Sequence, residues 1–496
     1  MHTHNSKNGH TPPVQPSRAR EYTPQAPVCE AINTYITAVC QQIRWKKARA
    51  PIADELTNHI SDTRDAYVAK GLPSHEATIA AIADTGDAEI IGTQLDRVHH
   101  PKPQWGMLST TAVLVMLGLA IYAYFAGGLS AERLIFTAVG VAALVAAYYI
   151  DFTWLAKYPK TMLFAVIAGV LVLLYLRSYG IHPSNLVNLW GDHSLQSGMR
   201  FFSMGDVLTL IFPLVLAIII FYAKGRGYWG LVITGLSFTL LTVVAIGMSV
   251  VGTARFMFIG FVLISVAIAK GVYGIRKLHA ALLTFGPVVL SGFLVFASMH
   301  EYQRQRFAVI FSPSSAAYGS GFMAILSRDV LSEAAWFGQG TTDALGRLLP
   351  FYPTSPIRVD AAMALTVLIG LMGWVVFVVI VGALAFFIAK GTIRCVGQKS
   401  SLGLLVSSAV MLTFAVQTVE YVTFNLGFHI ASPISLPLII SSNAAFIVNM
   451  AMVGFMLSVF RTGDAVQDRH YEYSRSRFVR WDNGRLIFDF KYGLQE

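Results

Sequence analysis

The chain has 496 residues and a formal net charge of +10, and 55% of its residues are hydrophobic while 13% are charged. A soluble domain carries roughly a quarter charged residues, so this composition excludes a wholly soluble protein and places most of the chain in a lipid bilayer. The three cysteines, Cys29, Cys40 and Cys395, contain no CxxC pair and exclude a disulfide framework.

The first hundred residues are more polar than the rest. Residues 1–28 are rich in proline and lack the apolar segment of a signal peptide, so we expect a disordered leader. Residues 29–104 have apolar residues at helical spacing, which predicts a small soluble helical module in the cytoplasm. Its third helix should start at Ser74, where Ser-His-Glu-Ala supplies an N-cap before Ile79 and Ile82. The other helices should contain Ile32 to Val39, Ile52 to Ile60 and Ile90 to Leu95.

Residues 105–461 contain about ten apolar stretches that approach the ~20 residues needed to cross a bilayer. Lysines and arginines fall in every second connection and after Arg461, so the positive-inside rule places these connections and both termini in the cytoplasm. The sequence therefore predicts an all-α, multi-pass protein of the plasma membrane. The expected spans are 107–127, 133–151, 160–177, 205–223, 228–250, 253–270, 279–298, 360–389, 401–423 and 434–460.

One extracellular connection is long, covering residues 300–359. A structureless loop of this length would be unusual, so we expect it to contain helices of its own and to have a function. Its arginines make the outer face basic, which suits an anionic substrate. They are Arg304, Arg306, Arg328, Arg347 and Arg358.

Asp360 follows this loop, at the mouth of the uncharged apolar run 361–389. An ionisable group at the edge of a bilayer is costly unless it has a partner or a task, so Asp360 is a candidate functional residue. The alternative is a helix N-cap paired with Arg358, because aspartate favours that position and suits the positive end of the helix dipole.

Glu420 lies about one helical turn inside the outer end of the ninth span, where its carboxyl should be paired or neutral. A hydrogen bond to Gln417 or to another helix and a role in substrate binding are both open. The chain has no G-x-x-x-x-G-K-[ST] phosphate loop, and no histidine or cysteine cluster has metal-ligand spacing, so spacing predicts no metal site. The basic, aromatic tail, residues 462–496, is expected to bind anionic lipid headgroups rather than nucleic acid.

Several outer segments occur in a characteristic order: Arg200 to Gly205, Tyr302-Gln303 with Arg306 and Pro313, Gly338 and Gly340, Asp360, and Leu436-Pro437. This order resembles the SEDS family (shape, elongation, division and sporulation), which includes RodA, FtsW and SpoVE. Several family segments are altered here. One keeps only Gly252-Thr253, the Ser-Tyr-Gly-Gly turn reads Ile440 to Asn443, the segment after Gly205 lacks the family's Gln-Pro-Ser-Glu, and the residues that flank Asp360 differ. The soluble module resembles the prefix domain found ahead of permease-like proteins.

The resemblance implies a peptidoglycan glycosyltransferase that polymerises lipid II at the outer face of the plasma membrane, in division, elongation or sporulation. It implies a class B penicillin-binding protein as the partner. Asp360 would be the base that takes the proton of the sugar 4-hydroxyl. Arg200, Arg304 and Arg306, or a divalent cation, would stabilise the departing undecaprenyl diphosphate, and Glu420 would bind substrate.

Two alternatives stay open. The first is a transporter or flippase for a lipid-linked precursor, in which Glu420 would be central and Asp360 peripheral. The second is a non-catalytic scaffold that binds a penicillin-binding protein, which the altered motifs allow.

Overall fold

The computed structural model describes residues 26–99, 103–150, 152–178, 204–300, 321–341, 343–348, 362–429, 433–463, 479–482 and 485–488. The chain forms two compact units, Met1–His100 and Pro101–Glu496. The predicted leader lies almost entirely outside the described residues, and so does most of the basic tail.

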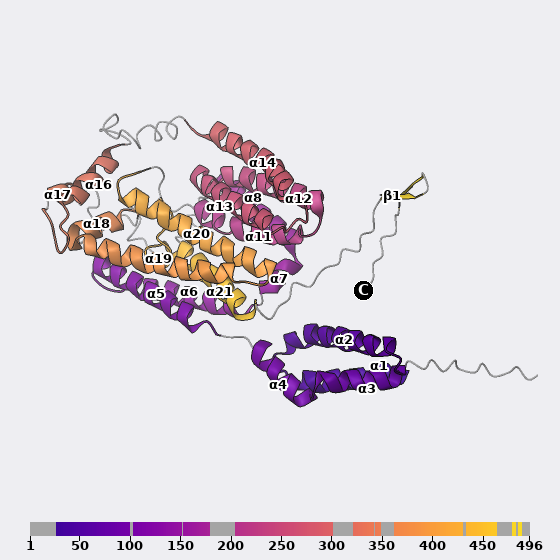
Figure 1. Cartoon of the computed structure of the whole chain (residues 1–496). Coiled ribbons are helices and arrows are strands. Elements are labelled where there is room, and N and C mark those ends of the chain that lie inside the picture. Colours follow the sequence, from indigo (N-terminus) through magenta and orange to yellow (C-terminus); the bar gives the residue numbers. More distant parts are fainter. Residues whose placement is uncertain are drawn as a thin grey trace, which may run out of the picture. The chain divides into compact units, whose positions relative to one another are not determined.

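The described part of the N-terminal unit contains four helices: α1 (Ala26–Gln42), α2 (Lys46–Ala69), α3 (Ser74–Thr85) and α4 (Ala88–His99) (Figure 1). Its core contains Ile32, Ile36 and Ile60, as the helical spacing predicts. The third helix starts at Ser74, as predicted, but the N-cap position is held by Pro73. Ile79 is 54% exposed because α3 buries the face that carries Ala77 and Ala81.

Eight helices in the described part of the second unit are long and apolar enough to cross a membrane. They are α5 (Trp105–Ala126), α6 (Ala131–Tyr149), α12 (Gly227–Ile246), α13 (Val250–Ala269), α14 (Lys277–Ser298), α19 (Trp374–Val396), α20 (Ser401–Asn425) and α21 (Asn443–Thr462). Two shorter apolar segments, Pro159–Val172 and Val207–Tyr222, fall in the remaining two predicted spans. These helices confirm a polytopic α-helical membrane protein.

The other helices described in this unit are α7 (Phe152–Lys157), α8 (Pro159–Ser178), α10 (Met204–Thr209), α11 (Phe212–Tyr222), α16 (Phe322–Glu333), α17 (Asp343–Leu348) and α18 (Ala364–Met372). In the tail, β1 (Val479–Asp482) pairs antiparallel with β2 (Arg485–Phe488). The two helices α16 and α17 lie in the long loop, as expected.

Three predicted spans are not continuous helices. The span 205–223 breaks between α10 and α11, where Pro213 follows the start of α11. The span 360–389 divides into α18 and α19 at Gly373, whose φ of +89° suits glycine. The span 434–460 becomes helical only at Asn443, because Leu436 to Ile440 form a tight turn instead.

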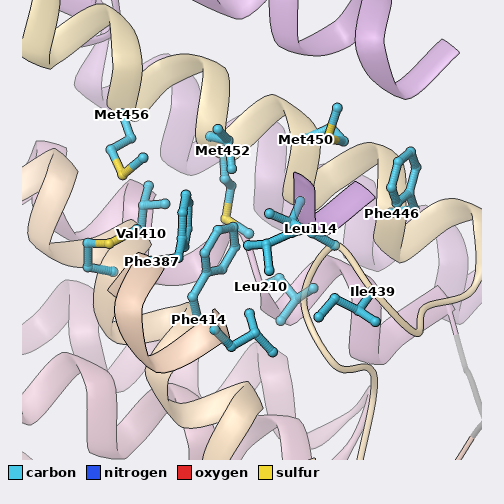
Figure 2. Close-up of a cluster of buried hydrophobic side chains, with 14 of the residues drawn as sticks. Leu114, Leu210, Phe387, Val410, Phe414, Ile439, Phe446, Met450, Met452 and Met456 are labelled. Carbon is cyan, nitrogen blue, oxygen red and sulfur yellow. The ribbon is translucent and has the colours of Figure 1, made fainter. Parts of the chain in front are cut away.

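The buried core of the membrane unit centres on α20 and α21. Phe414 of α20 lies beside Phe387 of α19, with ring centroids 6.2 Å apart, and faces Met452 of α21 (Figure 2). Ile439, in the turn before α21, belongs to the same cluster. The turn that leads into α21 is therefore buried among the membrane helices and does not lie on their surface.

Gly454 sets the close approach of α6 and α21. A Cβ atom at this position would lie 2.4 Å from the Leu144 carbonyl oxygen and 2.7 Å from the Ala147 Cβ. Small residues at such interfaces let helix backbones pack closely in a membrane.

We expect Gly454→Ala to lower the melting temperature of the purified protein, because overpacking costs about 1–3 kcal/mol. Gly382→Ala on α19 is the matched control, since a Cβ there meets nothing within 4 Å. The control should melt at the same temperature or higher, because alanine favours helix. Equal melting temperatures for the two variants would contradict the close approach.

Candidate functional site

Four of the five predicted site residues, Asp360, Arg200, Arg304 and Arg306, lie outside the described residues. Their roles stay predictions. Glu420 is described, and so is the segment that begins two residues after Asp360 and leads into α18.

Asn425, the last residue of α20, holds the start of α18. Its Oδ1 accepts hydrogen bonds from the backbone N–H of Thr366 at 2.9 Å and from the Thr366 hydroxyl at 3.0 Å. Its Nδ2 donates to the carbonyl oxygens of Ala362 at 2.8 Å and Tyr421 at 2.9 Å. Asn425 and Thr366 are fully buried, so these bonds fix the backbone that follows Asp360 against α20.

This arrangement excludes one interpretation of Asp360. The N-cap position of α18 is Met363, which makes no side-chain cap hydrogen bond. Asn425 accepts the N–H that an N-cap side chain would otherwise satisfy. The alternative that Asp360 is the N-cap of the helix after it is therefore wrong.

The turn after α16 is bonded to the break between α18 and α19. The N–H of Gly338 donates to the Met372 carbonyl and that of Trp374 donates to the Ala335 carbonyl, both at 3.0 Å. Gly338 has a φ of +73°, and a Cβ at Gly340 would lie 2.0 Å from the Glu333 carbonyl oxygen. Both glycines are thus required by a tight turn.

Glu420 forms an ion pair with Arg255 of α13, whose Nε donates to Oε2 at 2.7 Å. The Arg255 side chain is 2% exposed and the Glu420 side chain 24%. Glu420 is therefore paired, as expected, and this partner lies on another helix. Gln417 does not bond to Glu420, because its Oε1 accepts from the Ser435 hydroxyl at 2.9 Å and its Nε2 has no partner.

Sequence reasoning missed Arg255. It is the only charged residue in the sequence of α13, so the rule that singled out Asp360 applies to it as well. The resemblance to the altered family segment ends at Thr253, two residues before Arg255.

Arg133 was also missed, near the start of α6. Its Nη1 donates to the Ser441 carbonyl at 3.2 Å and to Asn443 Oδ1 at 3.1 Å, and Asn443 Nδ2 donates to Glu132 Oε1 at 3.2 Å. These bonds join the start of α6 to the start of α21 at the position of the altered Ser-Tyr-Gly-Gly turn.

The Leu-Pro motif forms the buried turn before α21. The N–H of Leu436 donates to the Ile440 carbonyl at 2.7 Å, and the N–H of Ile440 donates back at 3.0 Å. Leu438 has a φ of +66°, a conformation that side chains rarely adopt and that recurs at functional sites. A Cβ at Gly118 of α5 would lie 2.6 Å from the Ile439 carbonyl oxygen, so α5 packs directly on the turn.

Comparison with known proteins gives similarities in sequence and in fold. No protein-family model matches the chain. Over 166 residues, 34% of this chain, it is 26% identical to the peptidoglycan glycosyltransferase MrdB of Escherichia coli K12 and equally to that of Shigella flexneri. The match covers 44% of the length of these relatives. A chain from a peptidoglycan synthase complex that coordinates polymerization and crosslinking aligns over 74% of this chain and 99% of its own, with 18% identity and a TM-score of 0.50.

The membrane unit is thus a polytopic helical membrane protein with the fold of that synthase chain. The similarity to MrdB over part of the chain supports the resemblance to the SEDS family.

Proposed function

We propose that the chain is a peptidoglycan glycosyltransferase that polymerises lipid II at the outer face of the plasma membrane. The similarity to MrdB, which is named a peptidoglycan glycosyltransferase, carries this proposal. The fold shared with a chain of a peptidoglycan synthase complex supports it.

Asp360 is proposed to be the general base that takes the proton from the attacking sugar 4-hydroxyl. Such a base must be held within hydrogen-bond reach of its substrate. Two observations support the assignment: Asp360 is not the N-cap of α18, and Asn425 anchors the backbone that follows it.

Arg200, Arg304 and Arg306 are proposed to hold the diphosphate leaving group, since guanidinium binds phosphate oxygens in pairs. A divalent cation could supply the same charge. The described residues, which do not include Asp360, contain no group of three or more His, Cys, Asp or Glu side chains that could hold a metal ion.

The proposal also covers the orientation of the chain in the membrane, its lipid contacts and its protein partner. Both termini lie in the cytoplasm by the distribution of lysine and arginine, and the basic tail binds anionic lipid headgroups. A class B penicillin-binding protein is the proposed partner, which the synthase complex with the shared fold supports.

The test uses the purified full chain in lipid nanodiscs with a class B penicillin-binding protein, a divalent cation and labelled lipid II. We expect glycan polymers on a gel. Parallel vesicles containing the chain and labelled lipid II report movement of the label across the bilayer. Movement without polymer would overturn the proposal in favour of a transporter, and neither polymer nor movement would overturn it in favour of a scaffold.

A further inference from the structure

Arg255 has more hydrogen-bond donors than the protein satisfies. Its Nε is bonded to Glu420, but Nη1 and Nη2 are both buried and have no hydrogen-bond partner. The residue is 4% exposed, so water does not readily replace a partner. A buried donor left unpaired costs about 1–3 kcal/mol, and more if it is charged, so two such nitrogens on one side chain call for an explanation.

A second unpaired donor lies on the helix that carries the partner of Arg255. Gln417 Nε2 is buried without a partner, while Gln417 Oε1 is occupied by the hydroxyl of Ser435. Gln417 and Glu420 are three residues apart and so lie on the same face of α20. Hydrogen-bond donors of both α13 and α20 are thus unpaired on the face of α20 that contacts Arg255.

The position of these donors connects them to the proposed reaction. Glu420 precedes Asn425 by five residues, about 8 Å along the axis of α20. Asn425 in turn holds the segment that follows Asp360. Arg255 is in the second turn of α13, close to the positive end of that helix dipole, which favours an anion.

Phosphate is the ligand chemistry that such donors suit. The two Nη groups of a guanidinium form a planar fork that binds two phosphate oxygens at once. Glu420 cancels most of the charge of Arg255, so a ligand must offer strong acceptors with charge of their own. A sugar hydroxyl does not meet this requirement, and a diphosphate does.

We propose that Arg255 Nη1 and Nη2, with Gln417 Nε2, bind the diphosphate of an isoprenoid-linked substrate while Nε stays on Glu420. This site rests on the proposed function for the identity of the lipid-linked substrate. It adds a phosphate contact made by the membrane helices to the phosphate contacts proposed for the arginines of the outer loops. No bond is made or broken by these residues.

The test measures the Kd of undecaprenyl diphosphate for the full chain in neutral-lipid nanodiscs. Arg255→Gln should weaken binding roughly tenfold or more, the value of a hydrogen bond to a charged group, and Gln417→Ala should weaken it less. Glu420→Gln should tighten binding, because it keeps an acceptor for Nε but no longer cancels the charge of Arg255.

If the ion pair between Arg255 and Glu420 were purely structural, the binding measurements would give a different result. In that case Arg255→Gln and Glu420→Gln would both leave the Kd unchanged or both weaken binding, and either result would overturn the proposal. The double variant removes both charges without leaving one unpaired, so it should fold even if Arg255→Gln does not. It too should bind weakly, and tight binding by it would overturn the site.

Two further arms identify the source of the phosphate. Inorganic pyrophosphate should compete for the site, because the isoprenoid chain is not what the donors recognise. Competition by nanodiscs of phosphatidylglycerol, with none by pyrophosphate, would make this a lipid headgroup site and overturn the substrate assignment. Because Kd is measured without polymerisation, a chain that binds but does not polymerise would contradict the proposed function and leave this site standing.

Discussion

Replacement of Glu420 by alanine is expected to destabilise the membrane unit by about 3 kcal/mol, the low end of the range for breaking a buried ion pair. The variant leaves the 2%-exposed guanidinium of Arg255 without its carboxylate, while the 24% exposure of Glu420 moderates the loss. Thermal unfolding of the purified protein should show a melting temperature several degrees lower.

The double variant with Arg255→Ala is the control for this effect. Removing both charges should recover part of the lost stability, because the remaining cost is packing alone. If Glu420→Ala melted at the same temperature as the unaltered chain, the ion pair would not be part of the fold.

Asn425→Ala is expected to have the second large effect. It leaves the Thr366 N–H and the Ala362 carbonyl without their bonds to Asn425, at about 1–3 kcal/mol for each buried group. The start of α18 should then exchange backbone hydrogens faster, and polymerisation should fall because the segment after Asp360 loses its anchor.

Thr423→Ala on α20 is the matched control, since its hydroxyl donates only to carbonyls of its own helix, those of Val419 and Glu420. Hydrogen exchange over residues 362–372, followed by mass spectrometry, separates the two variants. Equal exchange in Asn425→Ala and Thr423→Ala would show that the amide does not hold α18.

The membrane helices could be predicted from sequence because hydropathy and length decide whether a segment crosses a bilayer. The breaks within the predicted spans could not be predicted from sequence. Gly373 separates two helices where the sequence reads as one apolar run, because backbone groups of the loop after α16 bond to the chain there. The turn at Leu438 likewise depends on its burial against α5, which local sequence does not contain.

The candidate site, too, could be predicted from sequence only in part. A carboxylate at Glu420 could be expected to be paired, but its partner is 165 residues away, and only the packing of α13 on α20 identifies Arg255. The lone charge of α13 was visible in the sequence, and the bond from Asn425 to Thr366 was not. Asp360 was proposed from the motif order, and its role stays a prediction.

The most direct test of the central claim compares two aspartates of the same outer region in one assay. Asp360→Ala should lower the rate of lipid II polymerisation by about 10²–10⁴-fold, the usual contribution of a general base. Asp343→Ala, at an exposed position in the first turn of α17, should leave the rate within a few-fold of the unaltered chain. Polymerisation by the Asp360→Ala protein at the rate of the Asp343→Ala protein would contradict the account.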